Sequence, residues 1–226
     1  IVASLRVFPL EMLVNGAPVG LGGVSSVACL PEHRRKGHVG RLLRHALAGM
    51  RERGQALSSL YTPHPALYRR SGWMVAGSAL KHTWNPKQVR LHHGHAPKGH
   101  PARVTEEDRP LLEALYQRFT AGRNGYLVRQ ERWWKEAFFR RLYDEQRTLN
   151  DIAVWRKDSG EATGYVSYRS SRERSLGGAP VDHMFVAEFV ALDGDAYSGL
   201  LRYLLSHDLA ADITWYAPPD EPLAFA

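Results

Sequence analysis

Residues 27–40 join a strand-like segment to an amphipathic helix through a short loop that is rich in arginine and glycine. Apolar residues recur every three or four positions from Val39 to Met50, which predicts a helix over 37–53. The first N–H groups of a helix have no partner within the helix and carry partial positive charge. Because glycine lets a backbone approach an anion closely, Gly37 and Gly40 predict a phosphate bound at this helix N-terminus. Spacing alone leaves an arginine-rich capping turn equally open.

Two widespread phosphate-binding patterns are absent from this loop. It lacks the G-x-x-x-x-G-K-S/T pattern of P-loop proteins and the G-x-G-x-x-G pattern of dinucleotide-binding folds. The loop therefore predicts a phosphate site of neither of these two kinds.

The remaining periodicities predict an α+β fold in two parts. Asn15 and Gly16 lie between two alternating apolar segments, a pattern typical of a hairpin over 3–29 closed by a type I′ turn. In the first part we further expect a strand at 56–61, a helix at 65–70 and a strand with a glycine break at 73–84. In the second part we expect helices at 106–121, 130–142 and 195–207, and strands at 151–156, 163–169, 182–191 and 212–216. The predicted domains are thus 1–85 and 103–226, with a linker rich in proline, glycine and histidine at 86–102.

Composition excludes or disfavours several classes of protein. The formal net charge is +7, but the arginines are scattered in short groups with few aromatic residues among them, so a nucleic-acid partner ranks last and is not expected. No apolar run approaches the roughly 20 residues of a membrane span and no signal segment opens the chain, so we expect a cytoplasmic protein without a membrane partner.

Metal and disulfide chemistry are not expected either. Cys29 is the single cysteine, which excludes an intrachain disulfide and a cysteine-built zinc site. The histidines of the linker are interpreted as part of a solvated connector, because no carboxylate or cysteine stands at ligand spacing. We therefore predict no metal at His92, His93, His95 and His100.

The loop and its flanks resemble the acetyl-CoA motif of the GNAT superfamily of N-acetyltransferases. The matching residues are a strand ending Val27-Ala28-Cys29-Leu30-Pro31, followed by Arg34-x-x-Gly37-x-Val39/Gly40. Two stretches are similar to the Eis (enhanced intracellular survival) branch in particular, His33-Arg34-Arg35-Lys36-Gly37 and Tyr68-Arg69-Arg70-Ser71-Gly72-Trp73. The resemblance continues in the second half at three stretches: Trp133-Trp134, Glu188-Phe189-Val190-Ala191 and Leu205-Ser206-His207-Asp208-Leu209. It therefore covers nearly the whole chain.

The resemblance implies tandem GNAT-like domains, each a mixed, mainly antiparallel sheet flanked by helices. It further implies that the first domain is incomplete at its N-terminus and that the second is a degenerate, non-catalytic copy. The turn of the second half carries Asp193 and Asp195 where the first half has its basic loop. These carboxylates are expected to occupy the anion site at the helix N-terminus. The sterol-carrier-like domain of the Eis branch has no counterpart in the sequence.

The resemblance also implies acetyl-CoA as the co-substrate and assigns residues to it. The backbone of Val27 and Cys29 is expected to hold the pantetheine arm. Tyr68 is expected to protonate the departing thiolate, with an amphipathic core tyrosine as the alternative. The pyrophosphate is expected to be bound by Arg34, Arg35, Lys36, Gly37, His38 and Gly40. Of these, His38 and Gly40 depart from the aliphatic residue and the arginine that are usual in the Eis branch.

The expected reaction is direct transfer of an acetyl group from acetyl-CoA to a primary amine in a ternary complex. The acceptor implied by the resemblance is an aminoglycoside-like small molecule or a lysine side chain, and a non-catalytic CoA- or nucleotide-binding module is the alternative. An acetylated Cys29 is disfavoured, because no His–Asp pair lies near it in the sequence. Glu32 and Glu188 are candidate carboxylates on the acceptor side, with a surface role favoured for Glu32. Assembly as a homo-oligomer is left open.

Overall fold

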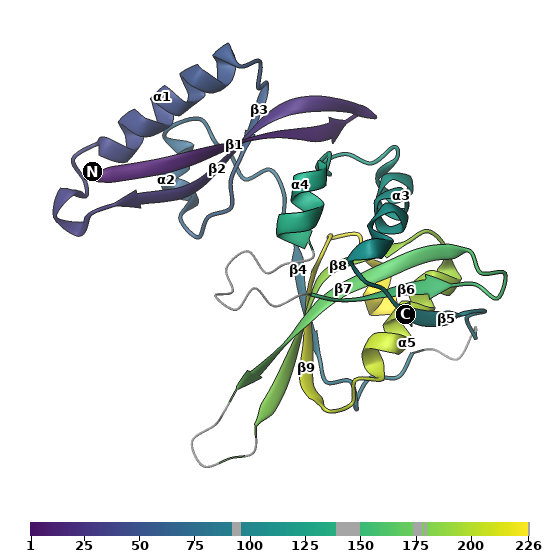
Figure 1. The fold of residues 1–226 in the computed structure, drawn as a ribbon. Coiled ribbons are helices and arrows are strands. Elements are labelled where there is room, and N and C mark those ends of the chain that lie inside the picture. Colours follow the sequence, from purple (N-terminus) through teal and green to yellow (C-terminus); the bar gives the residue numbers. More distant parts are fainter. Residues whose placement is uncertain (92–95, 139–149, 174–177, 179, 226) are drawn as a thin grey trace. The chain divides into compact units, whose positions relative to one another are not determined.

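The structure is a computed structural model that describes residues 1–91, 96–138, 150–173, 178 and 180–225. It divides into two compact units, residues 1–77 with 122–129, and residues 78–121 with 130–226. Each unit contains one mixed sheet with helices (Figure 1), which confirms the predicted α+β class. The predictions for His92, His93 and His95 lie outside the described residues. In the part of the chain that is described, no helix is long and apolar enough to cross a membrane.

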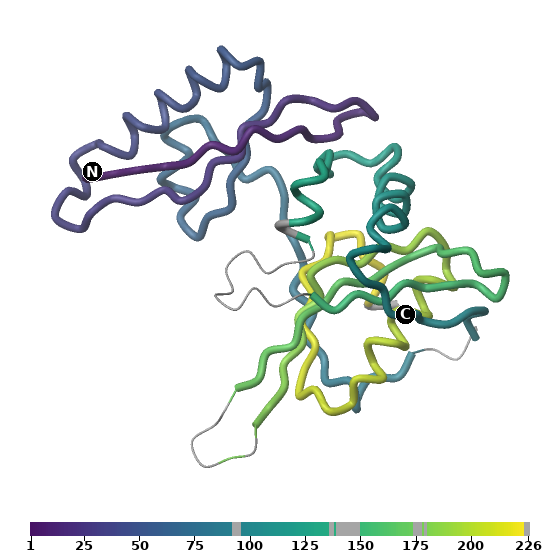
Figure 2. Tube along the Cα trace, in the orientation of Figure 1, coloured from purple at the N-terminus to yellow at the C-terminus, as the bar shows by residue number. Residues whose placement is uncertain are grey.

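The first unit is built on a long hairpin, whose path Figure 2 traces from the N-terminus. Strands β1 (Ala3–Val14) and β2 (Ala17–Cys29) pair antiparallel. Asn15 and Gly16 between them have φ values of 50° and 78°, as the predicted type I′ turn requires. A 3-10 turn (Pro31–His33), helix α1 (His38–Glu52), strand β3 (Leu57–Ser59) and helix α2 (Pro65–Arg69) follow.

Helix α1 packs against the sheet of this unit through its predicted apolar face. Leu43, Ala46 and Met50 are buried in one core with Val24 of β2 and Tyr68 of α2. The helix comes so close to the sheet that a Cβ at Gly22 would overlap the Met50 side chain. This close packing holds the C-terminal part of α1 against the middle of β2.

Residues 122–129 belong to the first unit, although they lie far along the chain. The N–H of Leu13 donates to the Tyr126 carbonyl at 2.8 Å, and the N–H of Val128 donates to the Glu11 carbonyl at 2.9 Å. The segment thus lies along the end of β1.

The second unit is a six-stranded sheet in the order β4-β9-β8-β7-β6-β5. Its strands are β4 (Leu80–Trp84), β5 (His100–Arg103), β6 (Asp151–Arg156), β7 (Ala162–Glu173), β8 (Val181–Ala191) and β9 (Ala210–Ala217). All neighbours pair antiparallel except β8 and β9, which are parallel. Its helical elements are a 3-10 turn (Glu106–Asp108), α3 (Arg109–Thr120), α4 (Glu131–Trp133), a π turn (Trp134–Phe138), α5 (Gly194–Leu205) and a 3-10 turn (Pro222–Phe225).

Strand β7 is buried over its first half and exposed over its second half. Its first seven positions, residues 162–168, are all buried, as expected for a strand covered on both faces. Val166 packs in the core that contains Leu200 of α5. Tyr165 contacts the ring of Phe138 with the ring centroids 5.8 Å apart.

Several predicted boundaries differ from the structure. The strand expected at 73–84 is formed only at Leu80–Trp84, and it pairs with β9 rather than within the first unit. His100–Arg103, expected in the linker, form β5 and pair with β6. Both partners lie at least 50 residues further along the sequence, so no local pattern indicated the pairing.

The two predicted N-terminal helices of the second half are also divided differently. Residues 106–121 begin with a 3-10 turn, closed by a capping box of Thr105 and Asp108, and continue as α3. The helix expected at 130–142 comprises α4 and the π turn up to Phe138, and residues 139–142 lie outside the described residues.

Candidate functional site

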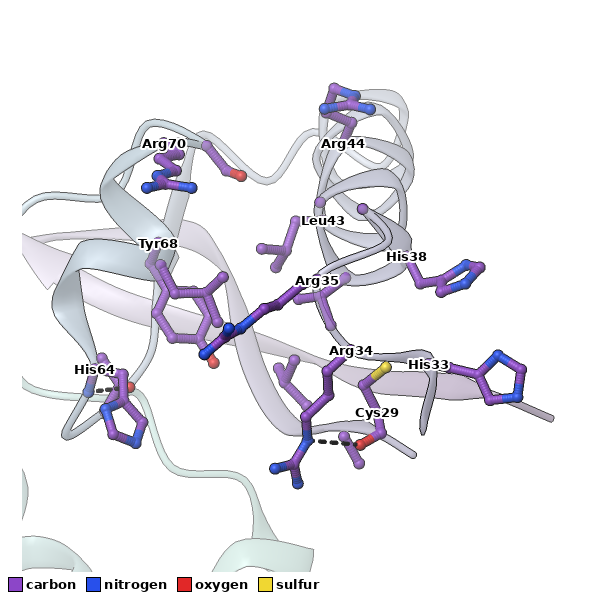
Figure 3. A pocket seen from close by; sticks show the side chains of 18 residues that line it. Cys29, His33, Arg34, Arg35, His38, Leu43, Arg44, His64, Tyr68 and Arg70 are labelled. Carbon is purple, nitrogen blue, oxygen red and sulfur yellow. Dashed lines mark hydrogen bonds between the residues drawn. The ribbon is translucent and has the colours of Figure 1, made fainter. Parts of the chain in front are cut away.

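A groove of roughly 1150 Å³ lies in the first unit where β2, α1 and α2 meet. Figure 3 shows arginine and histidine side chains around it, with Tyr68 on the α2 side. The groove is lined by residues 27–29 of β2, by residues 33–35, 37–40, 43 and 44 of the loop and α1, and by residues 62, 64, 67, 68, 70 and 71 around α2. We call it the basic groove.

One wall of the basic groove is the C-terminal part of β2, which extends beyond the residues that pair with the parallel strand β3. Strands β2 and β3 pair only from Leu21 to Gly23, whereas β2 continues to Cys29. Near its end β2 carries a bulge, at which the pairing with β1 shifts register and Ser26 adopts a φ of 52°. Bulges re-aim a strand locally and are frequent beside functional sites. Residues 27–29, directly after this bulge, line the groove.

The loop wall presents backbone and charge suited to an anion. Arg35 and Gly37 both have positive φ, 61° and 78°, and such alternation forms concave arrays of N–H groups that bind anions. Gly37 is also the N-cap of α1, and no side chain caps the helix. The N–H groups of the first turn therefore remain available beside the arginines.

The two arginines of the loop are arranged differently. The Nε of Arg34 donates to the Cys29 carbonyl at 3.3 Å, which ties the loop to the end of β2. In Figure 3 the Arg35 side chain extends from the loop towards the α2 side of the groove. Both are exposed, so they can bind a ligand without first being withdrawn from a buried ion pair.

Tyr68 lies on the opposite wall, in the short helix α2. The residue is only 9% exposed, and its ring packs edge-on against Trp73, with the centroids 6.3 Å apart. The Trp73 N–H donates to the Tyr68 carbonyl at 3.2 Å, and its indole Nε1 donates to Ser58 at 3.1 Å, so the segment after α2 holds the tyrosine in place. Tyr68 thus combines a fixed ring with a position on the groove wall.

The structure brings most of the predicted site residues together. Val27, Cys29, Arg34, Arg35, Gly37, His38, Gly40 and Tyr68 all line the basic groove. Lys36 is exposed and does not line it. The ring of His38 is held at the rim by Arg41, whose Nη2 lies 2.8 Å from His38 Nδ1.

Six polar groove residues were not among the site residues predicted from the sequence: His33, Arg44, Thr62, His64, Arg70 and Ser71. Helical spacing was a signal for Arg44, because it lies four residues after Gly40 on α1, and its Nη1 is 3.8 Å from where a Cβ on Gly40 would stand. His64 and Arg70 flank α2, and only the packing of α2 beside β2 brings them to the groove.

The other candidates lie away from the basic groove or have ordinary surroundings. Glu32 is exposed in the 3-10 turn, and Glu188 lies in the second unit, where it accepts a 2.6 Å hydrogen bond from the Tyr165 hydroxyl. The Cys29 thiol donates weakly to the Leu30 carbonyl at 3.6 Å. Neither carboxylate lines the basic groove.

Comparison with known proteins agrees with this geometry. Two family models, each described as an acetyltransferase (GNAT) domain, match residues 1–76 and 125–226. The chain therefore belongs to the GNAT acetyltransferase family. It is homologous to an uncharacterized N-acetyltransferase of Streptomyces avermitilis, with 30% identity over 97% of this chain and 54% of that protein. It is also homologous to the N-acetyltransferase Eis of Mycobacterium tuberculosis, with 27% identity over 95% of this chain and 52% of that protein. The chain thus spans about half the length of these relatives.

Solved structures show the same fold. A GCN5-related N-acetyltransferase from Anabaena variabilis superposes with a TM-score of 0.79 at 23% identity, over 98% of this chain and 54% of that one. Eis1 from Mycobacterium abscessus superposes with a TM-score of 0.73 at 24% identity, over 99% of this chain and 56% of that one.

Proposed function

We propose that the basic groove binds acetyl-CoA and that the protein transfers the acetyl group directly to a primary amine in a ternary complex. The observation that carries the proposal is the convergence, in one groove, of an uncapped helix N-terminus, a positive-φ loop with two arginines, and Tyr68. Membership of the GNAT family implies acetyl-CoA use, which supports the proposal.

The residues present fit the parts of this co-substrate. The N–H groups at the start of α1 and the side chains of Arg34 and Arg35 suit a pyrophosphate, since charge-assisted hydrogen bonds to phosphate are strong and directional. The backbone of Val27 and Cys29, free of β3 at this point, suits the amide groups of a pantetheine arm. Arg44 and Arg70 add positive charge along the same groove.

The chain's own contribution to the chemistry centres on Tyr68. Acetyl-CoA supplies a thioester carbonyl that a neutral amine can attack: the C–N bond forms, the C–S bond breaks and the sulfur leaves as a thiolate. A phenol beside that sulfur donates a proton and stabilises the developing negative charge. The nitrogen releases one proton to solvent as the amide forms, and solvent returns a proton to the phenolate of Tyr68. The side chain of Tyr68 is held by Trp73, so the hydroxyl needs little reorganisation at the moment of transfer.

The acceptor is proposed only as a primary amine. The relatives in the Eis branch suggest an aminoglycoside-like molecule or a lysine side chain, and these are the two acceptors to compare first. The rival function is a module that binds CoA without turnover, and it differs in one measurable respect, the release of free CoA thiol when an amine is added.

Tyr68→Phe tests the proposal in the full-length protein. The variant keeps the packing of the ring and removes only the hydroxyl group, so turnover should fall by about 10²–10⁴ while the Kd for CoA stays within a few-fold. Thiol release and calorimetry measure the two quantities. The matched control is Tyr216→Phe, an exposed tyrosine of the second unit. Full activity in Tyr68→Phe would remove the general-acid role, and no thiol release by the unmodified protein with any amine would favour the binding module.

A further inference from the structure

A second pocket adjoins the basic groove within the first unit. It measures roughly 400 Å³ and is lined by residues 58–62 at the end of β3, by Pro65, Tyr68 and Arg69 of α2, and by residues 73–77. Thr62 and Tyr68 line both this pocket and the basic groove. A molecule in the second pocket therefore contacts the residue proposed to protonate the leaving thiolate. We call it the apolar pocket.

The lining of the apolar pocket is mainly hydrophobic and open to solvent. Tyr61 is 98% exposed, Met74 73% and Val75 65%, although all three are large hydrophobic residues. Exposed apolar side chains gathered at a concave site commonly mark a ligand surface. Trp73 lines the same pocket, and its indole N–H donates a 3.1 Å hydrogen bond to the Ser58 hydroxyl, which fixes the indole ring.

The apolar pocket carries positive charge and no carboxylate among its described lining residues, whereas a site that binds a polycation needs negative charge. Arg69 is the one charged residue among those that line it in the described structure. The sequence holds no aspartate or glutamate between Glu52 and Glu106, so no carboxylate of this segment can pair with ammonium groups. A substrate with several ammonium groups would lose hydration here without gaining partners, and Arg69 would repel it.

The same charge favours a substrate with a single amine. A neighbouring cation lowers the pKa of an ammonium group, which raises the fraction present as the neutral nucleophile. Because the walls of the pocket are mainly hydrophobic, the rest of the substrate should be apolar. Resting on the proposed acetyl transfer, we propose that the apolar pocket is the acceptor site and that it selects a primary monoamine carried on an aromatic or branched apolar group.

Substrate competition in the full-length protein tests this proposal. We expect kcat/KM for 2-phenylethylamine to exceed that for the polycation kanamycin, and for a lysine peptide, by tenfold or more, since a well-filled apolar pocket discriminates by factors of this size. Met74→Asp places a carboxylate at the exposed rim and should lower kcat/KM for 2-phenylethylamine about tenfold while raising that for kanamycin. Met74→Leu should preserve the original preference.

Leu209→Asp is the matched control, because it adds the same charge at an 85% exposed position of the second unit and should leave the preference unchanged. Preference for kanamycin or the lysine peptide in the unmodified protein, or an unchanged ratio in Met74→Asp, would overturn the proposal. Calorimetric binding of 2-phenylethylamine, weakened by Met74→Asp, tests the pocket independently of turnover. Absence of thiol release with every amine, together with intact amine binding, would reject the acetyl transfer but not the pocket.

Discussion

The two units contain the same order of elements, an antiparallel hairpin, a helix and a strand parallel to the second hairpin strand. In the first unit these are β1, β2, α1 and β3, and in the second they are β7, β8, α5 and β9. The turns that lead into the two helices have opposite chemistry. In the first, Gly37 caps α1 without a side chain and two arginines stand beside it.

In the second unit the corresponding helix start is occupied by the protein's own carboxylate. Asp193 is the N-cap of α5, and its Oδ1 accepts a 2.8 Å hydrogen bond from the Ala196 N–H. Its Oδ2 lies 2.9 Å from the ammonium group of Lys157. A phosphate at this position would have to displace an anion that is already bonded, which fits the predicted degenerate copy.

The space beside α5 in the second unit is filled with side chains, whereas the corresponding space beside α1 in the first unit is open. In the second unit, rings from β8, α5 and β9 pack together, with the ring centroid of Phe189 of β8 5.5 Å from that of Tyr197 of α5 and 5.0 Å from that of Trp215 of β9. In the first unit β2, α1 and α2 leave the basic groove open instead. The comparison teaches that one topology can hold a ligand groove or a packed core, depending on a few residues in the turn and on the strands.

Reversing the charge of the basic loop should remove the difference between the two turns and have the largest effect of the proposed substitutions, a loss of CoA affinity. Arg34→Glu combined with Arg35→Glu removes two charge-assisted contacts and adds repulsion, so CoA binding should weaken by about 3 kcal/mol or more, over a hundredfold in Kd. Because the second unit caps its own helix, the unmodified protein should bind one CoA per chain, and the double variant should show no binding at CoA concentrations that just saturate the unmodified protein. Isothermal calorimetry on the full-length protein measures both.

Arg6→Glu combined with Arg51→Glu controls for the change in net charge, since both arginines are exposed in the same unit and lie outside the basic groove. This control should keep the affinity within a few-fold. Two equivalent CoA sites in the unmodified protein would show that the second unit has not lost its anion site.

Removing the carboxylate cap tests the other turn. Burial alone would raise the pKa of Asp193, but the hydrogen bond from the Ala196 N–H and the ammonium group of Lys157 outweigh it and hold the pKa below its usual value. Asp193→Ala should therefore lower the free energy of unfolding by about 1–2 kcal/mol at pH 7. A depressed pKa stabilises the fold above the unfolded value, near pH 4, and this contribution disappears as the pH falls through the folded value.

The difference between the unmodified protein and Asp193→Ala should accordingly shrink between pH 5 and pH 2.5, measured by urea denaturation. Asp193→Asn, which keeps an acceptor for the Ala196 N–H, should lie between the two at pH 7. A difference that persists unchanged at pH 2.5 would mean that packing, and not the charged cap, explains the loss.

The parts of the fold that were predicted well are those fixed by neighbouring residues. The turn at Asn15 and Gly16, the end of β2 before Pro31 and the apolar face of α1 all depend on local conformation or helical periodicity. The loop residues of the basic groove were found for the same reason, because they lie together in sequence.

What the sequence did not indicate depends on distant partners. Strand β4 takes its place from β9, and residues 122–129 return to β1 from between two helices of the other unit. Arg70 reaches the groove only because α2 packs beside β2, and the shared position of Tyr68 between two pockets follows from the same packing. Each of these is a tertiary contact with no periodic or local signature.

The smallest effect is expected when the same substitution, glycine to alanine, is made in both turns. Gly37 has a φ of +78° and Gly194 an ordinary φ in the first turn of α5, and a Cβ at either position would meet nothing within 4 Å. Gly37→Ala should therefore cost about 1 kcal/mol through backbone strain alone and weaken CoA binding up to tenfold. Gly194→Ala should leave stability unchanged or raise it by up to about 1 kcal/mol, since alanine favours a helix.

Urea denaturation and calorimetry of the two variants, side by side, measure the difference. Equal effects would mean that the left-handed conformation at Gly37 does not shape the groove, and the contrast between the two turns would then rest on charge alone.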